Sequence, residues 1–431
     1  MKNTIILLIS LIGLVPLSGQ NILTLEEAKE ITLENNFGIR IAKNNVELAK
    51  NQTDRSVNGY LPTINAQGGL NGNFGGAVQR FNNGQEASTS NAFNWGANAA
   101  INADYTLYNK GRDLTLEQLK ENLNLSNLQL RQSIEQSLVN VYIAYYQLAL
   151  NQQNVSVLEE SIEVSRERLR RAQYALEYGQ GTGLDVLNAE VDIKRDSVNL
   201  LNALLNVDNQ KRNLNVAMGS LNNEEFEISG DAEIRNDLDI EALLQTAKEQ
   251  NINLQINRQN LTLNEMDLGI IEAETKPTIT AGASYAFNYS DNATGSFIDQ
   301  SNSRGLSANV SVLWNIFDGS RDIRKQNTAI NLTNLRLQNE QIEQELARDI
   351  TNAWANYRNA VYILDVEESA VQTNQENFTR TEEQVRVGRL SSIEFRQAQL
   401  NLLNAQTSLN TAKLNAKLAE VQLLALVGGL L

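Results

Sequence analysis

The chain has 431 residues, of which 36 are Lys or Arg and 51 are Asp or Glu, and it contains neither Cys nor His; its formal net charge is −15. Without thiol or imidazole groups it cannot form a Cys/His zinc site, a disulfide, a cysteine nucleophile or a Ser-His-Asp triad. Nucleic acid is a disfavoured partner, because a basic surface is needed to displace counterions from phosphate. We therefore expect no enzymatic activity, no cofactor and no metal site.

Residues 1–19 have the parts of a secretory signal peptide. Lys2 supplies a positive charge, residues 5–15 form a short apolar core, and small residues precede a cleavage point before Gln20. The alternative is a frayed N-terminal helix. No later run reaches the ~18 to 20 apolar residues of a membrane helix, and no Cys follows the core to carry a lipid anchor. The chain is predicted to be exported, with any membrane contact made by strands.

The chain contains an internal duplication, marked by three pairs of similar segments in the same order. The pairs are PTINA at 62–66 with PTITA at 277–281, YTLYNKGRD at 105–113 with WNIFDGSRD at 314–322, and 178–190 with 387–399. Members of the last two pairs lie 209 positions apart. Each half is therefore predicted to hold a helix, two strands, a very long helix, a glycine turn and a returning helix.

This order of elements predicts the boundaries of eight segments. They are the signal peptide at 1–19, a first-repeat helix at 20–61, a β-hairpin at 62–110, a long helical hairpin at 111–219, a linker at 220–238, a second-repeat helix at 239–276, a second β-hairpin at 277–318, and a second long helical hairpin with the C-terminus at 319–431. The linker is acidic and breaks the periodicity of its neighbours, and nothing in it suggests chemistry.

The two β-hairpins are predicted from strict alternation. In residues 64–78 the even positions are apolar or small and the odd ones are mostly Asn, Gln or Gly, and 93–107 alternate in the same way. Each strand therefore has one apolar and one polar face. At about 15 residues, these strands exceed the ~9 to 11 that cross a membrane. A soluble sandwich would alternate similarly, but the signal peptide and the uncharged polar faces favour strands in a membrane.

Four strands cannot close a barrel by themselves. An open sheet edge in lipid leaves backbone groups unsatisfied at a cost of several kcal/mol each. The chain must therefore oligomerise if its strands lie in a membrane. Two copies would give eight strands, whose interior is filled by side chains, whereas three would give twelve strands with room for water.

The long helices are predicted from the absence of Pro and Gly between Asp113 and Tyr178, where apolar residues recur every three or four positions. Such a helix is about 100 Å long. The returning helices are about half as long, and residues 25–50 and 240–268 are the natural pieces to stack end to end with them. The helical seams contain Thr, Asn, Lys and Gln, which suits a wide tube better than a tight rod. An exported coiled-coil spacer would explain the helices but not the hairpins.

These segments together resemble the outer-membrane efflux proteins of the TolC type. The resemblance is carried by YGQGTGLDVLNAE at 178–190, VGRLSSIEFRQAQ at 387–399, LPTI at 61–64, and the exits YNKGR and FDGSR into the long helices. It covers nearly the whole mature chain. It implies a mixed α and β membrane protein in which antiparallel coiled-coil hairpins form a periplasmic α-barrel. The four strands of each protomer would complete the 12-stranded outer-membrane β-barrel of a homotrimer.

The resemblance also implies the partners and the docking residues. A periplasmic adaptor protein and an inner-membrane efflux or ABC transporter would deliver substrates to a duct in outer-membrane lipid. The adaptor would dock at the turns between the long helices, formed by Gly179, Gly181, Gly183, Leu184, Gly388, Leu390 and Ser391. The glycines are in any case suited to helix stops, since they accept positive φ. A phosphate loop is disfavoured at 179–183, because it follows a helix and lacks the Lys-Ser/Thr continuation.

Two carboxylates, Asp185 and Glu394, follow the two turns. Members of the resembling family can carry a ring of carboxylates at the pore constriction, at positions that match Glu394 and Gln397. Gln397 departs from that pattern, as does Asn188 in the first repeat. A ring of carboxylates would attract cations, whereas a carboxylate in a first helical turn also complements the helix dipole. Both interpretations remain open.

The sequence thus predicts a passive duct that lies in the bacterial outer membrane and extends into the periplasm. It would be the channel component of a tripartite efflux or type I secretion system. The alternative function is that of a structural or adhesive coiled-coil protein of the cell envelope, which would conduct no ions.

Overall fold

The computed structural model describes residues 21–220, 226–229, 233–235, 237–292 and 299–429. The predicted signal peptide, parts of the linker and part of the loop in the second β-hairpin lie outside these residues. The described chain falls into two compact units. The helical unit takes its residues from 1–41, 132–251 and 345–431, and the sheet unit takes its residues from 42–131 and 252–344.

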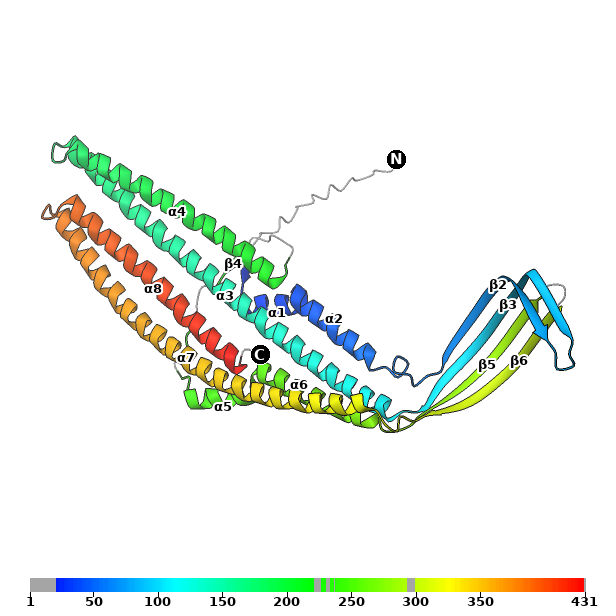
Figure 1. Ribbon diagram of the computed structural model, residues 1–431. Helices are drawn as coiled ribbons and strands as arrows, with labels where there is room; N and C mark the ends of the chain where they lie inside the picture. Colours follow the sequence, from blue (N-terminus) through cyan, green and yellow to red (C-terminus); the bar gives the residue numbers. More distant parts are fainter. Residues whose placement is uncertain (1–20, 221–225, 230–232, 236, 293–298, 430–431) are drawn as a thin grey trace, which may run out of the picture. The chain divides into compact units, whose positions relative to one another are not determined.

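The sheet unit contains one four-stranded antiparallel sheet in the order β2-β3-β5-β6 (Figure 1). Its strands are β2 (Thr63–Arg80), β3 (Glu86–Tyr108), β5 (Thr278–Asp291) and β6 (Gln300–Leu313). The hairpin of each repeat therefore lies beside the other through the pairing of β3 with β5. β2 and β6 are left as the two edges of the sheet.

The register of the sheet collects apolar side chains on one face. Leu70 is opposite Ala97, and Ala97 is opposite Tyr289. Leu70 is 83% exposed and Leu306 on β6 is 77% exposed, although both are large and apolar. A face of this kind is stable only where something other than water covers it.

Each repeat contributes one long helical hairpin (Figure 1). The first is formed by α3 (Lys110–Glu177) and α4 (Gly183–Met218), and the second by α7 (Gly319–Arg386) and α8 (Ser392–Val427). The long helices have 68 residues each and the returning helices 36 each. The two hairpins are thus equal in length, element by element.

Among the helices that the structure describes, none combines the length and apolar character needed to cross a membrane.

The segments expected as single helices at 20–61 and 239–276 are each divided in two. The pieces are α1 (Leu25–Asn35) and α2 (Phe37–Gln52), and α5 (Ile240–Gln250) and α6 (Ile252–Ala273). The breaks fall at Asn36 and Asn251, whose ψ angles of 126° and 121° lie outside the helical range. Each Asn side chain donates a hydrogen bond of 2.8 Å to a carbonyl at the end of a returning helix, Asn36 to Ala217 and Asn251 to Leu426.

The returning helices end tightly against these breaks. Gly219 after α4 has a φ of 76° and Gly428 after α8 has a φ of 81°. A Cβ at Gly219 would lie 2.6 Å from the carbonyl oxygen of Asn35, and one at Gly428 would lie 2.7 Å from that of Gln250. Both the backbone conformation and the space therefore require glycine.

A short parallel strand pair, absent from the sequence expectations, joins β1 (Asn21–Leu23) to β4 (Phe226–Ile228) in the linker. The Tyr145 hydroxyl lies 3.1 Å from the Leu23 carbonyl oxygen and 3.2 Å from that of Ser229. Buried apolar side chains from β4 and from α1, α3, α4 and α8 pack together here, with the partly buried Leu23 of β1 against them; the buried ones include Ala28, Val141, Leu148, Leu214, Phe226, Ile228 and Val421. The linker is thereby anchored in the core of the helical unit.

Candidate functional site

Glycine residues determine the conformation of the first turn, which joins α3 to α4. Gly179 has a φ of 69°, and the Gln180 amide donates to the Ala175 carbonyl over 2.7 Å, which closes α3 with a Schellman motif. A Cβ at Gly181 would lie only 3.0 Å from the Cβ of Ala175. Gly183 has open space around it and an ordinary φ. The turn therefore requires the first glycine for its φ, whereas a side chain at the second would press against Ala175 and one at the third would meet nothing.

The second turn has the same backbone design. Gly388 has a φ of 73°, and the Arg389 amide donates to the Gln384 carbonyl over 2.9 Å. Leu390 and Ser392 occupy the places that Gly181 and Gly183 hold in the first turn. Only the glycine with positive φ is thus common to both turns, in agreement with the physical demand for it.

Asp185 and Glu394 complete capping boxes at the starts of α4 and α8. The Asp185 carboxylate accepts from the Thr182 amide at 3.0 Å and from its hydroxyl at 2.7 Å. The Glu394 carboxylate accepts from the Ser391 amide and hydroxyl, both at 2.8 Å. Such boxes satisfy amides at a helix start that have no intrahelical partner.

The same hydrogen bonds keep both carboxylates ionised. Donation from the Thr182 hydroxyl and amide lowers the pKa of Asp185, and donation from the Ser391 amide and hydroxyl lowers the pKa of Glu394. Each negative charge is therefore present at neutral pH and fixed beside a turn. The structure gives the two side chains a capping role, and a role in a pore constriction stays a prediction.

A groove of about 930 Å³ lies between the two turns of the helical unit. It brings together Gly181, Asp185, Gly388, Leu390 and Ser391 from the predicted site. The remaining predicted residues, Gly179, Gly183, Leu184 and Glu394, are not among its lining residues. Other walls are formed by cationic and apolar side chains, namely Arg168, Arg171, Arg386, Val385 and Phe395.

A buried polar network near this groove was missed by sequence reasoning. Arg396 of α8 is 7% exposed and Asp196 of α4 is 3% exposed. The Arg396 guanidinium donates to both Asp196 carboxylate oxygens, at 2.6 and 2.8 Å. Bidentate pairing of a guanidinium with a carboxylate is among the strongest charge-assisted hydrogen-bond arrangements. It joins the second helical hairpin to the first.

Serine and glutamine side chains fill the remaining hydrogen bonds of the network. Gln399 of α8 donates to the Ser161 carbonyl at 2.7 Å and to the Ser165 hydroxyl at 2.9 Å, and Ser165 donates to Asp196 at 2.7 Å. An ion pair between Arg168 and Asp192 adjoins it. One signal was available in the sequence: Arg396 stands one helical turn before Leu400 on the apolar stripe of α8, where a lone charge needs a partner.

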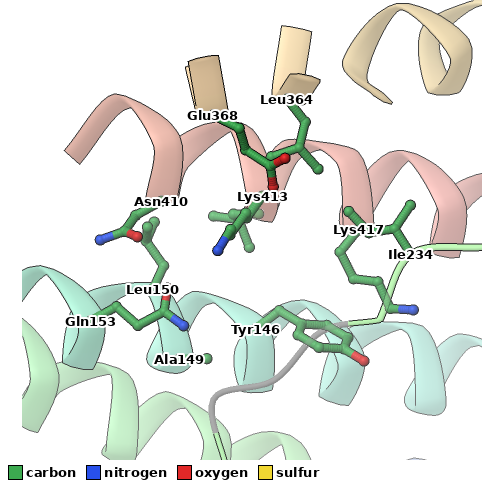
Figure 2. A pocket seen from close by; sticks show the side chains of 11 residues that line it. Tyr146, Ala149, Leu150, Gln153, Ile234, Leu364, Glu368, Asn410, Lys413 and Lys417 are labelled. Carbon is green, nitrogen blue, oxygen red and sulfur yellow. The ribbon is translucent and has the colours of Figure 1, made fainter. Parts of the chain in front are cut away.

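A second cavity of about 300 Å³ lies farther along the helical unit (Figure 2). Tyr146 and Gln153 of α3 lie on one side of it, and Asn410, Lys413 and Lys417 of α8 lie on the other. Lys417 donates to the Glu233 carbonyl at 2.6 Å and pairs with Glu420 at 3.0 Å.

Linker residues close one end of this cavity. Glu420 is 3% exposed, and its carboxylate accepts from the Arg235 amide at 3.2 Å. The Lys417 ammonium also lies 5.7 Å from the centre of the Tyr146 ring. The polar side chains at this end are therefore used to hold the linker, and the described residues contain no group of three or more acidic side chains placed to bind a metal ion.

The amphipathic sheet and the duplicated long helical hairpins define the class of TolC-like proteins. The chain has all the elements of one such subunit in the expected order.

The chain belongs to the outer membrane efflux protein family, whose model matches residues 30–220 and 243–429. It is accordingly a protein of the bacterial outer membrane that extends into the periplasm, in a family of efflux proteins and not of enzymes. No curated protein matches this chain in sequence.

Solved structures with the same fold include three outer-membrane proteins. The Campylobacter jejuni outer membrane channel CmeC is 16% identical, with 94% of this chain and 85% of that chain covered and a TM-score of 0.71. The open state of the Neisseria gonorrhoeae outer membrane channel MtrE is 17% identical, with 94% and 89% covered and a TM-score of 0.70. The Vibrio cholerae outer membrane protein VceC is 14% identical, with 94% and 96% covered and a TM-score of 0.70.

Proposed function

We propose that three copies of this chain form a passive duct across the outer membrane and periplasm. The duct would be the exit component of a tripartite efflux or type I secretion system. An inner-membrane efflux or ABC transporter and a periplasmic adaptor would supply the energy and the substrate. The structures of CmeC and MtrE, which are described as outer membrane channels, support the channel function through a shared fold.

The observation that carries this proposal is the open amphipathic sheet. Its edges β2 and β6 have unpaired backbone groups, and its apolar face is exposed. In lipid, each unpaired group costs several kcal/mol, so β6 of one copy must pair with β2 of the next. Three copies give twelve strands, enough to leave a water-filled interior.

A row of exposed apolar side chains on α4 supports the same assembly. The row consists of Leu184, Leu187, Val191, Val198, Leu201 and Leu205. Their spacing of three, four or seven is that of a coiled-coil seam. A helix of a neighbouring copy is the partner that this seam fits, because lateral contact between copies closes the ring of helices just as strand pairing closes the barrel.

The groove between the two turns is the proposed docking place of the adaptor. It combines three arginines with apolar side chains and backbone turns from both repeats. A helical hairpin of the adaptor with acidic and apolar side chains would complement it. Gly179, Gly183 and Leu184 would contribute the outer rim of this surface.

Asp185 and Glu394 are proposed to line the constriction of the same end. Their capping boxes hold them ionised, which suits a cation-attracting ring. Glu394→Gln should lower the preference for cations in single-channel recordings while its amide preserves part of the cap. Unchanged selectivity would leave Glu394 with the capping role alone.

Two measurements on the purified membrane fraction test the proposed function. On gels, unheated samples should run as a trimer and heated samples as a monomer, and planar bilayers with the protein should show discrete conductance steps. A trimer that conducts no ions would favour the alternative, a structural or adhesive coiled-coil protein of the envelope. A monomer in the soluble periplasmic fraction would sink the channel altogether.

A further inference from the structure

The polar face of the sheet is almost free of charge. Five charged side chains occur in the four strands: Arg80, Glu86, Asp104, Asp291 and Arg304. Arg80 and Glu86 pair with each other at 3.0 Å beside the turn of their hairpin. Asp291 is opposite Trp95 and Arg304 is opposite Phe287, on the apolar face. Asp104 is therefore the one unpaired charge on the polar face of the described strands.

The row of residues that contains Asp104 leaves its carboxylate open. Asp104 is opposite Thr63 on one side and Gly282 on the other, and Gly282 is opposite Asn309. A Cβ added at Gly282 would lie 3.4 Å from the Asp104 Oδ1 and 2.8 Å from the Asn309 Oδ1. The space above Gly282 is thus already taken up by the side-chain oxygens of Asp104 and Asn309, and the Asp104 side chain is itself exposed.

The adjacent row is neutral and tied together. Asn102 donates to Asn65 at 3.0 Å, and Ser284 donates to Asn102 at 2.7 Å. Amides and hydroxyls in such a ladder offer dipoles to a passing ion but no net charge. The contrast makes Asp104 the dominant electrostatic feature of this face.

The arginine nearest along the chain is already engaged. Arg112, in the first turns of α3, donates to the carbonyls of Gly59 at 2.9 Å and Thr106 at 2.8 Å. Its guanidinium also lies 4.0 Å from the Tyr60 ring centre and 3.8 Å from Asp113. No Lys or Arg of the described residues forms an ion pair with Asp104.

We propose that Asp104 sets the charge preference of the barrel lumen. This inference rests on the proposed trimer, in which three copies of Asp104 form a ring near the end of the sheet where β3 leads into α3. Three carboxylates facing water in a neutral, low-dielectric wall attract cations and repel anions. The cargo class that this ring admits most readily is cationic or neutral solutes, and anionic solutes are disfavoured.

The test is the reversal potential of single channels in a KCl gradient at low salt, where the Debye length is near 10 Å. Asp104→Asn should reduce the ratio of potassium to chloride permeability by at least about twofold, and the change should shrink in 1 M salt. Asp291→Asn, on the apolar face of β5, serves as the matched control and should leave the ratio unchanged.

Because the chain contains no cysteine, a cysteine placed at position 104 can be labelled selectively. The charge there can then be changed after the channel has folded and inserted, within a single variant. Asp104→Cys channels are treated, after insertion, with a methanethiosulfonate that carries either a sulfonate or a trimethylammonium group. The sulfonate should restore cation preference and the ammonium should reverse it. Equal selectivity after both reagents, in channels that still conduct, would overturn the role of Asp104 alone. A wild-type chain that forms no channels would overturn the proposed function as well.

Discussion

The first and second repeats of this chain share the structure of their turns and differ in which side chains their returning helices bury. Both hairpins have 68-residue and 36-residue helices, a glycine with positive φ at the turn, and a capping box at the start of the returning helix. Both returning helices end in a glycine that abuts an asparagine break. The features that recur are those that determine where a helix starts, stops and reverses.

The two returning helices differ in what they bury. α8 buries Phe395, Arg396, Gln399 and Glu420, whereas α4 exposes Leu187, Val191 and Val198. α8 therefore faces the other hairpin of its own chain, and α4 presents an apolar seam for something else. The two repeats therefore keep the same helix ends and turns. Their returning helices differ, because α8 makes contacts within the chain and α4 leaves an apolar surface for contacts outside it.

The largest expected effect comes from the buried pair that distinguishes α8. Arg396→Ala removes the partner of a carboxylate that is 3% exposed, and the stranded charge should cost about 3–5 kcal/mol. Thermal unfolding of the detergent-solubilised protein measures the loss. Arg380→Ala, which removes an arginine from an exposed pair on α7, is the matched control and should cost under about 1 kcal/mol.

A double variant sharpens this prediction. Arg396→Met together with Asp196→Leu replaces the ion pair by apolar side chains and should recover most of the stability, because neither charge is then left alone. If the double variant were as unstable as Arg396→Ala, packing and not charge would explain the effect, and the network would have no special part in joining the hairpins.

A smaller loss of stability, equal in the two repeats, is expected at the glycines that end the returning helices. Gly219→Ala and Gly428→Ala each place a Cβ within 2.7 Å of a carbonyl oxygen at a backbone of positive φ, and each should destabilise the helical unit by about 1–3 kcal/mol. Gly269→Ala, inside α6 with its nearest neighbour at 3.9 Å, should be neutral or slightly stabilising. Strongly unequal losses at Gly219 and Gly428 would contradict the equivalence of the two junctions.

Much of this framework is predictable from the sequence because it is local. Alternation over 64–78 and 93–107 predicts the strand faces, and Gly179 and Gly388 end the long helices through their own backbone freedom. The order of elements was therefore available from periodicity and turn residues, and the family resemblance added the class of protein.

The missed features depend on partners far away in the chain. The break at Asn36 combines a local hydrogen bond, accepted from the Ile39 amide, with a distant one, donated to a carbonyl 181 positions later. Arg396 is a buried ion only because Asp196 lies opposite it from 200 positions earlier. An Asn in a helical segment has only a modest helix penalty by itself. Neither partner can be identified from local pattern, and the short pairing of β1 with β4 has the same character.

The smallest effects are expected at the caps shared by both turns. Thr182→Ala and Ser391→Ala each remove a capping hydroxyl and should cost about 1 kcal/mol, detected as faster amide exchange in the first turns of α4 and α8. Thr373→Ala, which removes an exposed hydroxyl inside α7, should leave exchange at both turns unchanged.

The caps should also respond to acid in a defined direction. The pKa of Asp185 and that of Glu394 lie below their ordinary values of 3.8 and 4.5, so the caps contribute their full stability above about pH 4.5. This contribution is lost as the pH falls through the lowered values, because the protonated carboxyl accepts the amide hydrogen bond poorly. Amide exchange at the two turns, expressed relative to the intrinsic exchange rate at each pH, should accelerate together below pH 4, and Glu394→Gln should abolish the acid response at the second turn only. Acceleration that persisted there in Glu394→Gln would assign the acid sensitivity to another group and leave the two turns without a common electrostatic design.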